Sequence, residues 1–296
     1  MESADGVTYF ANEFWTSAQR QAHALHEVSY RACFKPQVPE FFISRLTAPG
    51  DAVHDPFMGR GTAPLQAALS GRRPVGNDIN PLSAMLVRPR LAPPSESAVA
   101  ARLRQIPWRS GAVERDDLLA FYHPATLRNL SSLRRWLLDV APADGHPDPV
   151  DDWIRMVALS RLTGHSAGYF SGYTLPPNQA VSVRSQRRIN ERLGLEPPER
   201  DIAALILKKT RSLLRNGPCA PHPAGLLCTG PADATPAIAD ASVSLVVTSP
   251  PFLDIVQYAD DNWLRCWFAG IDAGGIAISA HRTEGAWTAM VRSVLA

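Results

Sequence analysis

The sequence predicts an α/β protein in which an open, parallel sheet is interrupted by a mainly helical insertion. Three observations predict this class. Residues 51–79 show a strand, a glycine turn, a helix and a second strand in succession. A long stretch with helical periodicity follows, from about residue 95 to residue 223. Strand-like segments then return from residue 224, which indicates that the chain rejoins the sheet.

Proline and glycine mark the ends of the elements in the first part of the chain. A helix is expected to begin after Pro36 and to end before Pro49-Gly50. The next strand stops at Asp55-Pro56, and the helix after it ends at Gly71. We therefore expect helices over Gln37–Leu46 and Thr62–Ser70, and strands over Ala52–His54 and Pro74–Asp78.

The elements in the rest of the chain are predicted from hydrophobic periodicity and from proline-rich joints. The expected helices are Ser97–Ile106, Pro124–Val140, Asp151–Leu162, Asp201–Leu214 and Trp287–Leu295, and the expected strands are Ala224–Thr229 and Val243–Thr248. Proline clusters predict joints at 89–94, 142–149, 197–198 and 218–236. Between two of these helices lies an uncharged loop of glycine, aromatic and amide residues at 163–179.

The composition excludes several classes of protein. The chain has 296 residues and a net charge of +2, and it contains no apolar run long enough to span a membrane. Its first residues lack the basic and apolar regions of a signal peptide, which favours the cytoplasm. The four cysteines lie far apart without a C-x-x-C pair, so neither a metal site nor a disulfide framework is expected.

Positive charge is concentrated in one segment. Residues 181–216 hold nine basic and four acidic side chains, a local excess of five positive charges. A patch of this kind suits a phosphate backbone. The alternative is an ordinary solvated helix face.

The glycine turn has the features of a nucleoside-cofactor site. In the string Asp55-Pro56-Phe57-Met58-Gly59-Arg60-Gly61-Thr62, the two glycines allow the backbone to approach a ligand closely. The helix that begins at Thr62 points its free N–H groups toward the same space. Asp78 ends the next strand, where an acid can accept hydrogen bonds from a ribose. Position 64 is proline and the turn lacks lysine, so it is neither a dinucleotide fingerprint nor an ATP-type phosphate loop.

A second motif, Ser249-Pro250-Pro251-Phe252, directly follows the strand Val243–Thr248. A hydroxyl and a backbone carbonyl there can accept hydrogen bonds from the amine of a nucleobase, which aims the nitrogen lone pair at an electrophile. Prolines stiffen the turn, and Phe252 can stack on a base taken out of a duplex.

Both motifs closely resemble those of the S-adenosylmethionine-dependent DNA amino-methyltransferases. The resemblance rests on Asp55–Thr62 with Gly76-Asn77-Asp78-Ile79-Asn80-Pro81 and Ser249–Phe252, and on an upstream segment, 26–36, with Lys35-Pro36 as its core. It implies a Rossmann-like methyltransferase sheet that binds S-adenosyl-L-methionine. The implied cofactor-binding residues are Lys35, Pro36, Asp55, Pro56, Phe57, Gly59, Gly61, Thr62, Asp78, Ile79 and Asp233, and the implied catalytic residues are Ser249, Pro250, Pro251 and Phe252.

The resemblance also implies that the chain divides into three segments with different functions. Residues 1–94 form the cofactor-binding half, 95–223 an insertion that reads DNA, and 224–296 the catalytic half. Within the insertion, Asn178 and Gln179 carry amides able to pair with adenine edges. Tyr258, Asp261, Asn262 and Trp263 are expected to line the target pocket or brace its lid, and the alternative is an aromatic-rich helix packed on the sheet. Family members continue with further strands after a helix like Trp287–Leu295, so C-terminal strands are expected to be missing.

The implied activity is transfer of a methyl group to the N4 amine of a flipped cytosine in double-stranded DNA, because Thr-Ser-Pro-Pro with Phe is typical of N4-cytosine enzymes. The alternatives are an N6-adenine enzyme and a truncated, inactive DNA-binding relic. Pro218-Cys219 resembles the dipeptide of carbon-5 methyltransferases, but it lies in a proline-rich joint and not after an apolar strand. A cognate restriction endonuclease and a homodimeric partner are further expectations.

Overall fold

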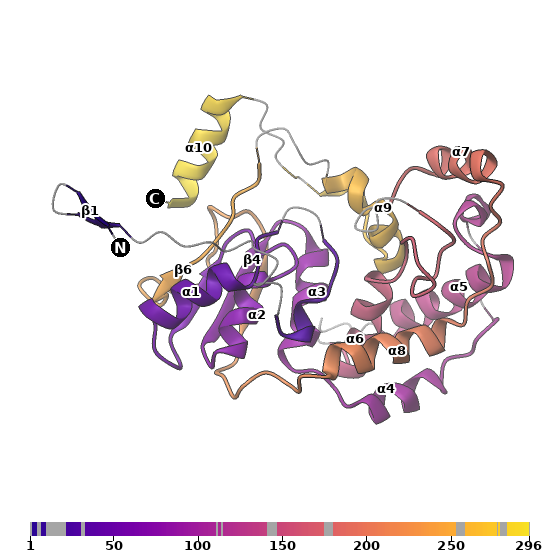
Figure 1. Ribbon diagram of the computed structural model, residues 1–296, viewed down its shortest axis with the longest axis horizontal. Helices are drawn as coiled ribbons and strands as arrows, with labels where there is room; N and C mark the ends of the chain where they lie inside the picture. The colour runs from indigo at the N-terminus through magenta and orange to yellow at the C-terminus, as the bar shows by residue number, and fades with distance from the viewer. Residues whose placement is uncertain are drawn as a thin grey trace.

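We analysed a computed structural model, which describes residues 2–4, 7–9, 22–30, 33–110, 112–113, 115–140, 147–174, 180–252, 258–276, 278 and 283–295. Its centre is a parallel sheet of four strands in the order β5-β4-β3-β6 (Figure 1). These strands are Ala52–Asp55 (β3), Arg73–Asp78 (β4), Leu226–Thr229 (β5) and Leu245–Val246 (β6). Val53 pairs with Pro74 on one side and with Leu245 on the other. The α/β prediction with a parallel central sheet is confirmed.

The strand order reverses direction beside β3. The chain passes from β3 outward to β4 and β5, and then returns to place β6 on the opposite side of β3. Backbone hydrogen bonds from Ser244 and Val247 to β3 extend the pairing of β6 beyond its two residues. Open parallel sheets bind ligands outside the carboxyl ends of the strands at such a reversal. The expected site is therefore the crevice beyond β3 and β6.

Three helices lie against the sheet: α1 (Gln37–Leu46), α2 (Thr62–Leu69) and α3 (Pro81–Leu91). The first two have the bounds that proline and glycine predict, to within one residue. The third is an unexpected helix, and the predicted joint at 89–94 is wrong over its first three residues. Asn80 caps its start by accepting a hydrogen bond from the Leu82 amide, and Pro89 falls in its last turn, where a missing N–H breaks little of the helix.

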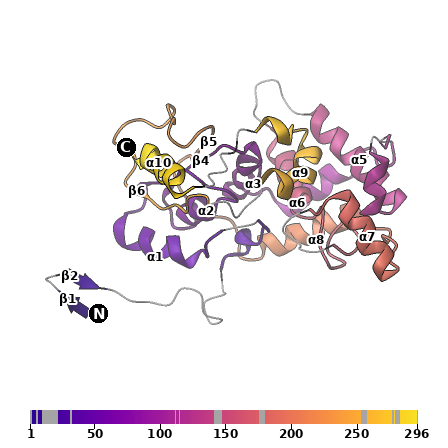
Figure 2. The same cartoon turned by 90° about the horizontal axis from the view of Figure 1, so that it is seen from above.

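The connection from β4 to β5 forms a helical layer beside the sheet (Figure 2). Its helices are α4 (Glu96–Leu103), α5 (Pro124–Asp139), α6 (Pro149–Leu159), α7 (Val183–Leu193) and α8 (Ile202–Leu214). Two 3-10 helices, η2 (Ala24–His26) and η3 (Asp116–Ala120), pack against this layer. Trp153 is fully buried at its centre and donates an indole hydrogen bond of 3.0 Å to Thr210.

The chain after β6 also contributes to this layer. Helix α9 (Tyr258–Ala269) contacts α5 and α6, and the ring of Trp263 lies 6.0 Å from that of Phe121. The expected helix is confirmed, but the expectation that it packs on the sheet is wrong, because it packs on other helices. The remaining elements are β1 (Glu2–Ala4), β2 (Val7–Tyr9), η4 (Ala273–Gly275) and α10 (Glu284–Leu295).

Among the described residues, no helix combines the length and apolar character needed to cross a membrane.

Candidate active site

The glycine turn after β3 requires both of its glycines. Gly59 and Gly61 adopt φ values of +49° and +77°, a region that other residues rarely adopt. A Cβ atom at Gly61 would lie 2.2 Å from Cγ2 of Val87, so α3 packs where a side chain would be. Gly61 is also the residue before α2. The turn thereby delivers the N-terminus of α2 to the carboxyl end of β3.

Asp78 ties this turn to the end of β4. Its Oδ2 accepts a hydrogen bond of 2.8 Å from the Gly59 amide, and its Oδ1 accepts one of 2.9 Å from the Asn80 amide. Burial raises the pKa of Asp78, and these two hydrogen bonds act in the opposite direction. A carboxylate has about four acceptor positions, so Asp78 retains capacity for hydroxyl donors.

Asp55 joins the two strands on either side of the reversal. Its Oδ1 accepts hydrogen bonds from the Phe57 amide at 3.1 Å and from Oγ1 of Thr248 at 2.7 Å. Asp55 is 1% exposed, and this burial raises its pKa to about 7 against the effect of both hydrogen bonds. Thr248 immediately precedes Ser249, so the glycine turn and the Ser-Pro-Pro-Phe motif are held next to one another.

Both motifs line one cavity. It is bounded by Tyr30, Cys33, Phe34, Asp55, Phe57, Met58, Gly59, Arg60, Thr62 and Ser249. Its enclosed volume is about 20 Å³. That is room for a group the size of a water molecule or a methyl, so any larger part of a ligand has to lie outside the enclosed region.

The other predicted residues lie around this cavity or away from it. Gly61 is buried at the start of α2, and Pro56 and Ile79 flank the turn and the end of β4. Pro250 and Pro251 are half-buried, and Phe252 is 54% exposed. The Pro251 carbonyl accepts a hydrogen bond of 2.6 Å from the indole of Trp287 in α10.

The structure does not bring Lys35, Pro36 or Asp233 into the cavity. Lys35 is exposed, and Pro36 lines a separate, open depression between α1 and the end of α8. Asp233 is exposed on the loop after β5. That loop nevertheless starts beside Asp78, whose carbonyl accepts a hydrogen bond of 3.0 Å from the Gly230 amide.

The segment before α1 contributes residues that the motif-based prediction did not single out. Tyr30, Cys33 and Phe34 line the cavity, in place of the expected Lys35 and Pro36. Arg60 fixes this segment by donating a hydrogen bond of 2.9 Å to the Val28 carbonyl. Fully buried Arg90 donates to the carbonyls of Leu25 and Arg60. The aromatic residues Tyr30 and Phe34, which precede Lys35-Pro36 in the sequence, could have indicated this part of the cavity lining.

The expected DNA-reading amides Asn178 and Gln179 lie outside the described residues, as does the side chain of Tyr258. Asn262 accepts a hydrogen bond of 2.8 Å from Arg265, and the Trp263 indole donates to the Ala180 carbonyl at 3.3 Å. Both side chains brace α9 within the helical layer, and neither lines the cavity.

Comparison with known proteins gives two matches for parts of the chain. The family model described as DNA methylase matches residues 6–85. The Type II methyltransferase M.MjaII of Methanocaldococcus jannaschii is 35% identical over 72 residues, which cover 24% of this chain and 13% of the relative. The matched segment is thus a small part of that relative. No solved structure matches.

The family match contains Asp78, and it contains the glycine turn and the segment that supplies Tyr30, which together form most of the cavity wall. Residues 6–85 of the chain are thus similar to the N6/N4 DNA amino-methyltransferase family.

Proposed function

We propose that this protein transfers a methyl group from S-adenosyl-L-methionine to the exocyclic N4 amine of a cytosine flipped out of double-stranded DNA. The observation that carries the proposal is the shared cavity, because Ser249 and the glycine turn reach it from the two strands beside the sheet's reversal. Methyl transfer requires the donor site and the acceptor site to be in contact, and residues proposed for both sites line this one cavity.

The residues present fit the cofactor. The positive-φ glycines let the backbone approach a ligand closely, and the N-terminus of α2 offers backbone N–H groups that suit the methionine carboxylate. Asp78 has acceptor capacity for the ribose hydroxyls, and Asp233 is proposed to reach the adenine amine from the adjoining loop. When bound, the cofactor supplies an electrophilic methyl group on a sulfonium. The enclosed part of the cavity has room for a group of that size, and the nucleoside would lie over the open edge beside Asp78.

The chain's own residues then act on the target base. Ser249 and a carbonyl of the following turn accept hydrogen bonds from the amine and orient its nitrogen toward the cavity. Pro250 and Pro251 remove two amide donors that would compete there. Exposed Phe252 offers a ring on which the extruded base can stack. Attack by the amine forms the N–C bond and breaks the S–C bond, and the proton leaves the nitrogen afterwards.

The experiment that tests this proposal uses purified protein, labelled S-adenosylmethionine and plasmid DNA. The plasmid is then digested to nucleosides, which are identified by mass. N4-methylcytosine is the expected product. N6-methyladenine in its place would refute the cytosine assignment, and no methylated nucleoside together with no calorimetric binding of the cofactor would favour the inactive relic.

Two partner proposals accompany this function. The relative is named a Type II methyltransferase, and we propose by analogy that an endonuclease with the same target site cleaves DNA that this protein has not methylated. Plasmid methylated by this protein should then resist that endonuclease. A homodimer is tested by light scattering on the eluted protein, where a monomer mass would refute it.

A further inference from the structure

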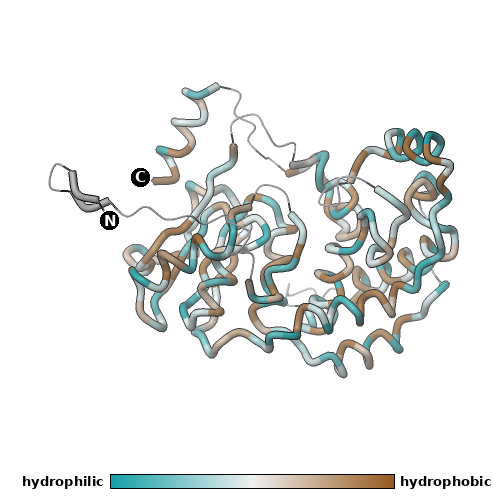
Figure 3. The backbone as a smooth tube through the Cα atoms, viewed as in Figure 1, coloured by the Kyte–Doolittle hydropathy of each residue, from teal (hydrophilic) through white to brown (hydrophobic). Residues whose placement is uncertain are grey.

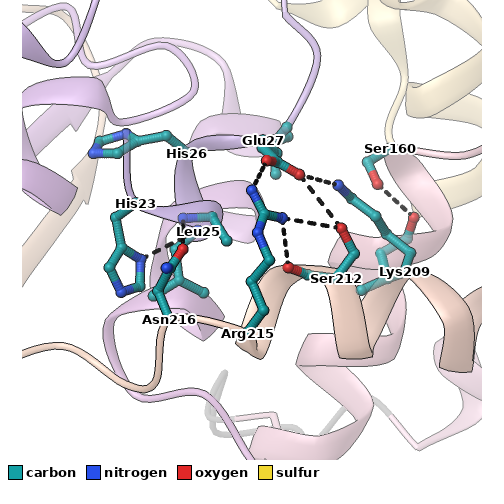
Figure 4. Close-up of polar contacts among 12 residues, drawn as sticks. His23, Leu25, His26, Glu27, Ser160, Lys209, Ser212, Arg215 and Asn216 are labelled. Atoms are coloured by element: carbon teal, nitrogen blue, oxygen red, sulfur yellow. Dashed lines mark hydrogen bonds and ion pairs between the residues drawn. The ribbon is translucent and has the colours of Figure 1, made fainter. Parts of the chain in front are cut away.

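The basic segment at 181–216 divides into two groups with different surroundings. In its second half, three cations in or just after α8 have acidic partners from other parts of the fold, whereas Lys208 is exposed without an ion pair in the described part of the chain. Lys209 lies 3.3 Å from Glu27, and Arg215 also pairs with Glu27 (Figure 4). Arg211 lies 2.6 Å from Glu96. The hydrogen bond from Arg215 is the main reason why the pKa of Glu27 falls to about 2. These three cations hold neighbouring elements to α8.

Helix α7 carries cations of a different kind. Arg184, Arg188 and Arg192 are exposed, and none forms an ion pair within the described part of the chain. Their spacing of four residues places them along one face of the helix. Figure 3 shows that α7 is mostly hydrophilic along its length, whereas α8 alternates with apolar residues. Arg187 lies beside this stripe and helps to lower the pKa of Asp117, so it is already partly engaged.

The opposite face of α7 fixes the helix to the fold. Gln186 donates a hydrogen bond of 2.9 Å to the Tyr173 carbonyl, and Asn190 donates one of 2.8 Å to the Ala120 carbonyl. Ser182 caps the start of the helix, and Gly194 ends it at a φ of +59°. The arginine stripe is therefore presented outward by a helix whose rotation about its own axis is set.

The start of α7 is also tied to the chain that leaves the active site. The Trp263 indole in α9 donates to the Ala180 carbonyl at 3.3 Å, and the Ala180 amide donates to the Asp261 carbonyl at the same distance. Helix α9 is the first helix after the Ser-Pro-Pro-Phe motif. In Figure 1, α7 and the chain leaving β6 both lie at the upper side of the molecule, whereas α4 lies at its lower edge.

From this arrangement we infer that Arg184, Arg188 and Arg192 form a phosphate-binding stripe that holds the backbone of duplex DNA beside the target site. The inference rests on the proposed function for its choice of polyanion. Steps of four residues rise about 6 Å each, so the stripe spans about 12 Å. That length matches about three to four base-pair steps of B-DNA. Arginine stays charged at every physiological pH and suits phosphate geometry. Contacts of this kind set the register of the duplex without reading its sequence.

The test measures binding of a fluorescent DNA duplex by anisotropy at several salt concentrations. The variant R184Q/R188Q/R192Q should weaken binding and reduce the slope of log K against log salt by about 2.7, because each lost phosphate contact removes about 0.9. The matched control R104Q/R109Q/K208Q removes the same charge from exposed positions around α4 and α8 that form no ion pair in the described part of the chain, and it should leave the slope unchanged. The variant R184K/R188K/R192K keeps the charge and should keep the slope.

Several outcomes would overturn the inference. Equal slopes for the wild type and the α7 glutamine variant would show that the stripe touches no phosphate. An equal loss in the α4/α8 control would show an effect of net charge alone. A larger loss on duplex RNA than on duplex DNA would reassign the ligand. Calorimetric binding of S-adenosylmethionine tests the proposed function separately, because a protein that fails this assay can still show the predicted salt slopes.

Discussion

Thr248 donates a hydrogen bond of 2.7 Å to Asp55, and this bond connects the carboxyl ends of β6 and β3. The two residues are 193 positions apart in the chain. Because Thr248 directly precedes Ser249, and Asp55 begins the glycine turn, one bond fixes the distance between the two halves of the candidate site. Asp55 is buried, so the loss of this donor would leave part of a buried carboxylate unsatisfied.

We expect Thr248→Val to destabilise the protein by about 1–3 kcal/mol near pH 8, because a buried carboxylate loses a charge-assisted donor. Thr248→Ser keeps the hydroxyl and should restore most of that loss. Urea unfolding of the two variants measures the difference. The difference in unfolding free energy between the Val and Ser variants should become smaller below pH 7, because protonated Asp55 accepts a weaker hydrogen bond from the hydroxyl. Equal stability of the Val and Ser variants at pH 8 would contradict this role.

The pKa of Asp55 predicts a pH dependence of stability. Burial raises that pKa from 3.8 to about 7, so between these values the folded state holds a proton that the unfolded state releases. The stability contributed by this group is complete below about pH 4 and is lost as the pH rises through about 7. Asp55→Asn cannot ionise, so relative to the wild type it should gain stability as the pH rises from 4 to 7. Unfolding free energies of both proteins at pH 5 and pH 8 test this prediction. A loss of stability of Asp55→Asn relative to the wild type over this interval would contradict it.

Asp78→Ala should weaken binding of S-adenosylmethionine by about 1–3 kcal/mol, because it removes the acceptor proposed for the ribose and leaves the Gly59 amide without its partner. Isothermal titration measures the affinity. Asp240→Ala, an exposed acid on a loop outside the cavity, is the matched control and should bind normally. Unchanged affinity in the Asp78 variant would remove Asp78 from the cofactor site.

Phe252→Ala should lower methyl-transfer turnover by about tenfold or more while leaving cofactor affinity nearly intact. The reason is that its exposed ring is proposed to stack on the target base, and stacking contributes about 1–3 kcal/mol per base. Turnover and cofactor titration are measured on the same preparation. Parallel loss of both would indicate a structural role for the ring.

Gly61→Ala should be more destabilising than Gly217→Ala. Both glycines have a positive φ, +77° and +82°, which costs about 1–2 kcal/mol for a residue with a side chain. At Gly217 a Cβ would meet open space, but at Gly61 it would lie 2.2 Å from Val87 and add about 1–3 kcal/mol of overpacking. Thermal or urea unfolding ranks the two variants, and equal costs would mean that α3 yields easily at Val87.

Much of the local structure follows from the sequence, because neighbouring residues decide it. Pro36 and Gly71 mark the start of α1 and the end of α2, and Asp55 and Ser249 follow or end parallel strands at the edge of the sheet where ligands bind. Gly59 and Ser249 line the same cavity, which agrees with the rule that ligands bind where strand order reverses. Periodicity was less informative for α3, since Pro89 lies within it, and for α7, whose face carries charge and little apolar surface.

Other features depend on residues that are distant along the chain. The sequence shows nine cations in one segment, but the positions of Glu27 and Glu96 decide that Lys209, Arg211 and Arg215 are paired while the stripe on α7 faces outward. Likewise, Tyr30 and not Lys35 reaches the cavity, because Arg60 fixes the backbone at Val28. Composition and periodicity determined the elements and the two motifs. Packing between remote segments determined which side chains share the site, since local propensity contains no information about those contacts.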